Sequence, residues 1–169
     1  MSFKVEFKNY LDDLHKSLCE VSDWMYENPE LGFQEFKTSK HLVDYIQKNS
    51  KSVNYPSHGL ETAFDITFGE DGPLVVICVE YDALPEIGHA CGHNIIATAS
   101  IGAGLGLKDI ASKLGIRVKL LGTPAEEGGG GKIILINEGA FEDASCSMMI
   151  HPGYEDVVNP TFTTIQQYT

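Results

Sequence analysis

The sequence predicts an α/β fold with a mainly parallel sheet and flanking helices. Leu74–Val79 is a continuous apolar run, which is typical of a strand covered on both faces. Helical segments then alternate with two further apolar strands. This β-α-β-α-β order favours parallel pairing, with helices on the faces of the sheet. A chain of 169 residues suits one domain with a real core.

The remaining elements follow from periodicity and turn residues. Apolar residues at steps of three and four predict a helix over about 4–27, and a second helix is expected at about 35–48. Phe64, Ile66 and Phe68 alternate with polar residues, which predicts a half-buried strand. After the strand at 74–79 we expect a helix from about Ile95 to Ser112, a strand at 116–121, a short helix at 132–138, a strand at 147–150 and another extended segment at 162–169.

The composition excludes several partners. The chain has 24 acidic and 12 basic residues, a formal net charge of −12 that repels phosphate backbones and anionic lipids, so neither nucleic acid nor a membrane surface is expected as a partner. No apolar run approaches the roughly 20 residues that cross a bilayer, and the N-terminus lacks a signal-peptide core. Cys19, Cys78, Cys91 and Cys146 form no CxxC pair, which indicates free thiols in a reducing, cytoplasmic environment.

Side chains that bind metals follow three successive strands. In an open α/β sheet, ligands collect beyond the carboxyl ends of the strands, so these side chains are expected at one rim. Histidine, cysteine and carboxylate groups are the ligands of zinc and similar metals. The sequence therefore predicts a metal site at this rim. The candidate residues are Asp82, His89, Cys91 and His93 after the first inner strand, Glu126 and Glu127 after the second, and His151 after the third.

Several of these residues allow more than one role. His89 is interpreted as a structural or supporting histidine rather than a ligand. Asp82 could be a capping or turn residue, or it could orient a ligating imidazole. Glu126 and Glu127 could lie in a solvated loop; alternatively, one binds metal while its neighbour takes a proton, and their proximity raises the proton affinity of one of them. Asn94 is expected to cap the following helix.

The glycine-rich loop Gly128–Gly131 suggests a competing phosphate site. It fails the P-loop pattern, because Lys132 is followed by Ile133 rather than by Ser or Thr. The neighbouring carboxylates would also repel phosphate, and no GxGxxG motif follows the first inner strand. A nucleotide-binding α/β domain is therefore the less favoured alternative.

Four motifs resemble, in order and spacing, those of the M20 peptidase family: Tyr81–Pro85, His89–His93, Gly122–Glu127 and His151–Gly153. The match is closest to the amidohydrolase branch that carries Cys in place of a bridging Asp. Within this branch, the motifs look like those of the aminoacylase-type dipeptidases grouped as M20 domain-containing protein 2. Asn94 departs from the Asp that is common at the end of the HACGHD motif, which weakens an assignment to the auxin-conjugate hydrolases.

This resemblance implies a zinc-peptidase-like catalytic domain with two divalent metal ions per site, Zn²⁺ or Mn²⁺. The metals would polarise the scissile carbonyl and activate a water molecule. The implied reaction is hydrolysis of amide or peptide bonds in small N-acyl amino acids or dipeptides. The implied roles are metal ligation by Cys91, His93, Glu127 and His151, with Cys91 bridging, general-base catalysis by Glu126, and orientation or tuning of the site by Asp82.

Members of the resembled family are more than twice as long as this chain. The resemblance therefore implies that residues 1–169 are the N-terminal part of an M20 catalytic domain, without the lid (dimerisation) domain and the C-terminal part of the catalytic domain. Those parts would supply a last histidine ligand and an oxyanion-stabilising histidine. The full-length form is expected to be a homodimer, and this chain alone is expected to show little hydrolase activity. A truncated, non-catalytic metal-binding or assembly module is the alternative.

Overall fold

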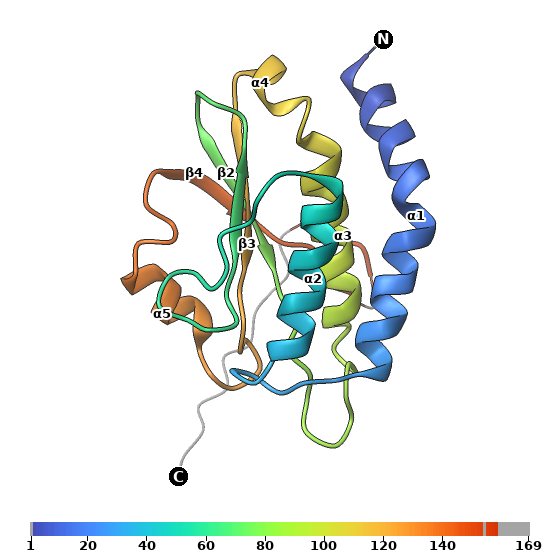
Figure 1. The fold of residues 1–169 in the computed structure, drawn as a ribbon, viewed down its shortest axis with the longest axis vertical. Coiled ribbons are helices and arrows are strands. Elements are labelled where there is room, and N and C mark those ends of the chain that lie inside the picture. Colours follow the sequence, from blue (N-terminus) through green and yellow to red (C-terminus); the bar gives the residue numbers. More distant parts are fainter. Residues whose placement is uncertain (1, 154, 159–169) are drawn as a thin grey trace.

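A four-stranded sheet forms the centre of the computed structural model, which describes residues 2–153 and 155–158 (Figure 1). The strand order is β1-β3-β2-β4. The central strand β2 (Leu74–Val79) pairs in parallel with β3 (Arg117–Gly122) and β4 (Ala144–Met148), whereas β1 (Asp65–Phe68) runs antiparallel to β3. The predicted α/β class is confirmed, with an antiparallel edge strand on a mainly parallel sheet. The predicted segment 162–169 lies outside the described residues.

Three helices cover one face of the sheet (Figure 1). They are α1 (Phe3–Glu27), α2 (Phe36–Asn49) and α3 (His93–Leu107). Alternate side chains of β2, among them Ile77 and Val79, point to this face and pack with apolar residues of the helices. Burial of these side chains is the main force that holds α1–α3 on the sheet.

The opposite face of the sheet is covered by α5 (Gly131–Asn137) and the segment that follows it (Figure 1). Val76 and Cys78 of β2 point to this side and pack with Leu121 and Leu135. Apolar side chains of β2 thus enter two cores, one on each face. This arrangement explains the uninterrupted apolar run of β2 and confirms that the strand is covered on both faces.

Two helical predictions need correction. The single helix expected from Ile95 to Ser112 is two helices, because α3 ends at Leu107 and α4 (Ala111–Leu114) follows a turn. Asn94 does not cap α3: Gly92, in the left-handed conformation, holds the N-cap position, and the Asn94 amide donates to Ser22 Oγ at 3.0 Å. Asn94 therefore ties α3 to α1.

The strand predicted at 147–150 begins earlier, at Ala144, and ends at Met148. Its position is determined by backbone pairing with β2, in which Leu74 faces Ala144 and Ile77 faces Met148. The apolar residues Met149 and Ile150 lie beyond the last pair.

No helix of the described ranges is both long and apolar enough to cross a membrane. All four cysteines are free thiols.

Candidate metal centre

His93 lies at the centre of the candidate site, and its side chain is buried at the first residue of α3. Its Nδ1 lies 3.0 Å from Oδ1 of Asp82, a buried residue just after β2. Burial alone would raise the pKa of Asp82, but hydrogen bonds from His93 and from the Glu127 backbone hold that pKa below its usual value. The Asp82 carboxylate therefore accepts the Nδ1 proton, which directs the Nε2 atom of His93 to the rim.

Three carboxylates lie near Nε2 of His93. The Nε2 atom is 3.4 Å from Glu127 Oε1, 3.5 Å from Glu80 Oε2 and 3.8 Å from Glu126 Oε2. Burial lowers the pKa of His93, but Asp82, Glu80 and Glu127 together raise it above its ordinary value. This concentration of negative charge around one imidazole favours the binding of a cation.

The buried atoms of this cluster support the same conclusion. Among the described residues, Nε2 of His93 and Oε2 of Glu80 are buried without a hydrogen-bond partner. Such atoms are rare in folded proteins, because leaving them unpaired costs free energy. Ligand atoms of Glu80, His93 and Glu126 all lie within 4.8 Å of one another. The donor set of imidazole and carboxylates therefore fits a divalent transition-metal ion.

Glu80 is a site residue that sequence reasoning missed. Its side chain is 2% exposed, it follows β2 directly, and its second oxygen forms an ion pair with Lys132 of α5. The residue stands between Val79 and Tyr81, at the end of an apolar run and outside any spaced motif. The sequence offered one signal for Glu80, which is an acidic residue directly after an apolar strand. Such a residue is seldom buried unless its charge is paired.

Glu126 and Glu127 follow β3, the strand that pairs with β2, and both carboxylates lie within 4 Å of Nε2 of His93. The Glu127 backbone N–H donates to Asp82 Oδ2 at 2.9 Å, which joins this loop to the residue that holds His93. Burial raises the pKa of Glu126, the charge of Glu80 raises it further, and Lys132 partly offsets both effects. Glu127 raises this pKa as well, as expected for adjacent acids, although burial and Glu80 contribute more.

The glycine-rich loop folds around Ala125. The backbone N–H groups of Gly129 and Gly131 both donate to the Ala125 carbonyl oxygen at 3.2 Å. A Cβ at Gly131 would collide with the Pro124 carbonyl, and one at Gly129 would collide with Phe33. These two glycines therefore permit a close turn, and their amides are used inside the protein rather than directed at a phosphate.

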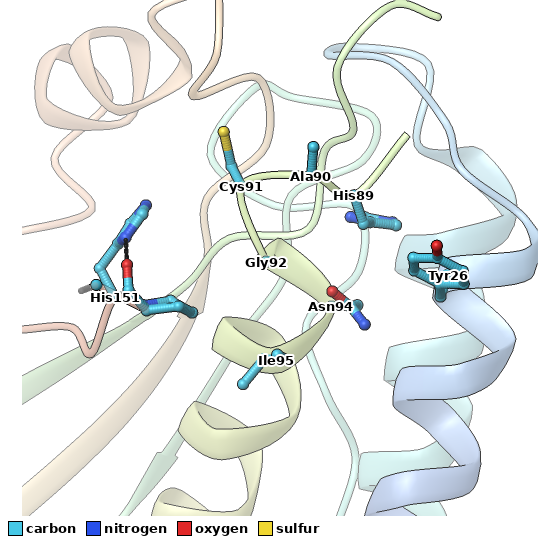
Figure 2. A pocket seen from close by; sticks show the side chains of 10 residues that line it. Tyr26, His89, Ala90, Cys91, Gly92, Asn94, Ile95 and His151 are labelled. Atoms are coloured by element: carbon cyan, nitrogen blue, oxygen red, sulfur yellow. Dashed lines mark hydrogen bonds between the residues drawn. The ribbon is translucent and has the colours of Figure 1, made fainter. Parts of the chain in front are cut away.

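Cys91 and His151 both line a pocket beside the start of α3 (Figure 2). The Cys91 thiol is half-buried, and its interaction with the Glu127 carboxylate, together with burial, raises the pKa of Cys91 to about 11. The exposed His151 ring lies edge-on to His93, with 6.2 Å between the ring centroids. Gly92 permits this approach, because a Cβ there would lie 2.9 Å from Cγ of Pro152. The four predicted ligands thus lie near one another, but among the described residues the group whose ligand atoms lie within 4.8 Å of one another is Glu80, His93 and Glu126, which includes only His93 of the four.

A pocket of about 480 Å³ opens beside Cys91 and His151. Figure 2 shows His89 and Tyr26 on its other side. His89 is 5% exposed, and neither ring nitrogen has a hydrogen-bond partner in the described part of the chain. Burial, followed by the charge of His93, lowers the pKa of His89 and favours its neutral form.

Comparisons with known proteins show which proteins the chain resembles. No protein-family model matches the chain. The Xaa-Arg dipeptidase of Mus musculus is 38% identical over 160 residues, which cover 86% of this chain and 37% of that protein. A p-aminobenzoyl-glutamate hydrolase chain of Escherichia coli (strain K12) is 29% identical, and the match covers 87% of this chain and 35% of that protein.

A solved structure supplies the deciding observation. A dinuclear metal-binding peptidase of the M20 family from Bacillus subtilis superposes with a TM-score of 0.73 and 26% identity, over 80% of this chain and 42% of that one. The chain belongs to the M20 family. Its curated relatives are named as hydrolases. This M20 chain spans little more than a third of the length of the curated relatives it matches, at 37% and 35%.

Proposed function

We propose that this M20 chain forms the metal-binding part of a hydrolase that cleaves amide or peptide bonds in dipeptides or small N-acyl amino acids. The observation that carries the proposal is the buried Nε2 of His93. It has no hydrogen-bond partner among the described residues, and the carboxylates of Glu80, Glu126 and Glu127 lie within 4 Å of it. The dinuclear metal-binding peptidase with the same fold supports the proposal.

The proposed ligands of two divalent cations, Zn²⁺ or Mn²⁺, are Cys91, His93, Glu127 and His151. Their types suit these ions: a thiol, two imidazoles and a carboxylate. Glu80 adds a buried negative charge at the same place. When bound, the cations would polarise the scissile carbonyl and increase the acidity of water at the centre.

Glu126 is proposed as the general base. Its carboxylate reaches the cluster but is exposed, so it can accept a proton from water and return it to the leaving amine. The raised pKa of Glu126 moves this group toward the neutral range in which a base is effective. The Asp82 carboxylate accepts hydrogen bonds from Nδ1 of His93 and from the backbone N–H of Glu127, and so orients two proposed ligands at once.

The substrate is proposed to enter by the pocket beside Cys91 and His151. Relatives named as a dipeptidase and as an aminobenzoyl-glutamate hydrolase support a small substrate with an amide bond. We propose further that residues 1–169 correspond to the N-terminal part of the catalytic domain, and that full turnover and homodimer formation depend on the segments by which the relatives are longer. The free thiols suit a cytoplasmic location.

A non-catalytic metal-binding module would use the same cluster. The two functions are separated by titrating the metal-stripped chain with Zn²⁺ or Mn²⁺ and then assaying hydrolysis of a panel of dipeptides and N-acyl amino acids. The same assays are run on a longer protein that contains these residues. Metal binding with hydrolysis in the longer protein supports the proposal. Metal binding without hydrolysis in either protein favours the non-catalytic module, and failure to bind either metal contradicts both.

A further inference from the structure

Glu35 is a fully buried carboxylate that the proposed chemistry does not use. It stands at the N-cap position of α2, and its side chain does not belong to the cluster around His93. Oε1 accepts a hydrogen bond from the backbone N–H of Ala125 at 2.8 Å, and Oε2 accepts one from the Thr62 hydroxyl at 3.0 Å. Glu35 therefore joins α2 to the residue directly before Glu126 and Glu127.

Ala125 has a backbone that needs such support. Its φ is +55°, in the left-handed region that a residue with a Cβ seldom adopts without compensation from its surroundings. The residue is fully buried, so its N–H group requires a partner within the protein. The Glu35 carboxylate is that partner. The carbonyl oxygen of Ala125 accepts hydrogen bonds from the backbone N–H groups of Gly129 and Gly131.

The segment that contains Glu35 contacts both loops of the site. A Cβ at Gly32 would lie 3.0 Å from Cα and Cβ of Ala125, so the segment packs directly on this residue. The carbonyl of Glu30 accepts a hydrogen bond from the Ala83 backbone at 2.8 Å, next to Asp82. The segment before α2 therefore fixes the loop after β2 and the loop after β3 relative to each other.

We infer that Glu35 is a positioning residue for the metal centre: by holding the Ala125 backbone, it keeps Glu126 and Glu127 directed at His93. The inference rests on the proposed function, because the centre it serves is the proposed one. Burial raises the pKa of Glu35 above its ordinary value, although hydrogen bonds from its own backbone, from Ala125 and from Thr62 lower it.

Two substitutions separate the hydrogen bonds from the charge. In Glu35→Gln, the side-chain oxygen can still accept a hydrogen bond from the Ala125 N–H. The side-chain NH₂ can donate to the Thr62 hydroxyl, because a hydroxyl oxygen accepts as well as donates. In Glu35→Leu both contacts are lost, and two polar groups are left buried without partners. Ile46→Ala is the matched control, because it removes buried apolar volume from α2 in a core that includes no residue of the 123–131 loop.

The experiment measures two quantities on the metal-stripped 169-residue chain and its variants: amide hydrogen exchange of peptides that cover residues 123–131, and affinity for Zn²⁺ by titration. Glu35→Leu is expected to increase exchange in this loop and to weaken Zn²⁺ binding about 10- to 100-fold, as is usual when a support of a metal site is lost. Glu35→Gln is expected to retain the slow exchange and most of the affinity. Ile46→Ala is expected to lower the melting temperature while leaving both quantities unchanged.

Several outcomes decide the inference. The inference is overturned if Glu35→Leu shows the same loop exchange and the same Zn²⁺ affinity as Ile46→Ala. It is also overturned if Glu35→Gln and Glu35→Leu lose Zn²⁺ affinity and slow exchange to the same extent. If Glu35→Leu does not fold, Glu35→Asp replaces it, because the shorter side chain withdraws from Ala125 while keeping its charge; unchanged exchange in that variant is then the contradicting result. If the unsubstituted chain binds no Zn²⁺, the proposed function fails, and the exchange measurement still decides whether Glu35 holds the loop.

Discussion

Nε2 of His93 and Oε2 of Glu80 face each other at 3.5 Å, both buried and both without a hydrogen-bond partner among the described residues. The other oxygen of Glu80 is paired with Lys132. One carboxylate thus lies between an ammonium group and the imidazole of the proposed metal centre. We therefore expect the stability of the metal-free chain to be linked to metal binding.

The first prediction concerns that link. Lys132→Met leaves the buried Glu80 carboxylate without its cation, which should lower the free energy of unfolding by about 1–3 kcal/mol. If Glu80 faces the centre, Zn²⁺ compensates the same charge. Saturating Zn²⁺ should then raise the melting temperature of Lys132→Met more than that of the unsubstituted chain. Glu80→Gln combined with Lys132→Met is the control, and it should lose this additional increase. Equal increases in all three proteins would show that Glu80 does not take part.

The second prediction concerns the orientation of His93. In Asp82→Asn the side chain can no longer accept two charge-assisted hydrogen bonds, so the imidazole and the Glu127 backbone lose their common support. Zn²⁺ affinity should fall about 10- to 100-fold. Asp65→Asn is a matched control, because Asp65, at the start of β1, also lies beside a histidine, His58. Calorimetric titration of the two variants gives the comparison, and equal affinities would exclude an orienting role for Asp82.

The third prediction separates the two adjacent glutamates. Glu126→Gln should keep Zn²⁺ affinity but lower turnover about 10²- to 10⁴-fold, as expected on loss of a general base. Glu127→Gln should weaken metal binding itself. Metal affinity and the rate of dipeptide hydrolysis are measured on the same preparations, with hydrolysis measured in a protein that is active before substitution. Similar metal loss in both variants would overturn this division of roles.

The fourth prediction is a pH dependence away from the centre. His41 of α2 stacks on Trp24 of α1 with 4.1 Å between ring centroids, and burial lowers the pKa of His41 below its ordinary value of 6.5. The unfolded chain therefore takes up the proton first, and the stability contributed by this contact is lost as pH falls through 6.5 toward the folded pKa. His41→Phe keeps a ring in this place without a proton site. Relative to this variant, the free energy of unfolding of the unsubstituted chain should decrease between pH 7.5 and 5.5. A constant difference across this range would contradict the assignment.

The sequence was sufficient for the order of the strands and for the expectation that the residues after β2 and β3 lie close together. Parallel strands place their carboxyl ends together, so the residues after β2 and β3 had to converge once the strands were recognised. Asn94 was misread because a preference for capping says nothing about tertiary partners, and its amide is used by Ser22 of α1. The limits of β4 were misplaced because the backbone register with β2, rather than the apolar residues Met149 and Ile150, decides where pairing ends.

Two buried carboxylates were beyond reach of sequence patterns for a physical reason. Glu80 is paired with Lys132, which lies 52 residues further along the chain, and Glu35 reaches Ala125 across 90 residues. Neither pair has a spacing that local geometry dictates. Their partners are determined by packing of the loops on one another, which becomes visible only in three dimensions.

The most direct measurement is an anomalous difference map, collected at the zinc edge from crystals of the chain grown with Zn²⁺. The proposed centre predicts a peak about 2.0–2.1 Å from Nε2 of His93, with the Cys91 sulfur about 2.3 Å from a zinc ion. Glu127 and His151 should complete the same site. A peak confined to surface carboxylates, or no peak within reach of His93, would contradict the proposed metal centre.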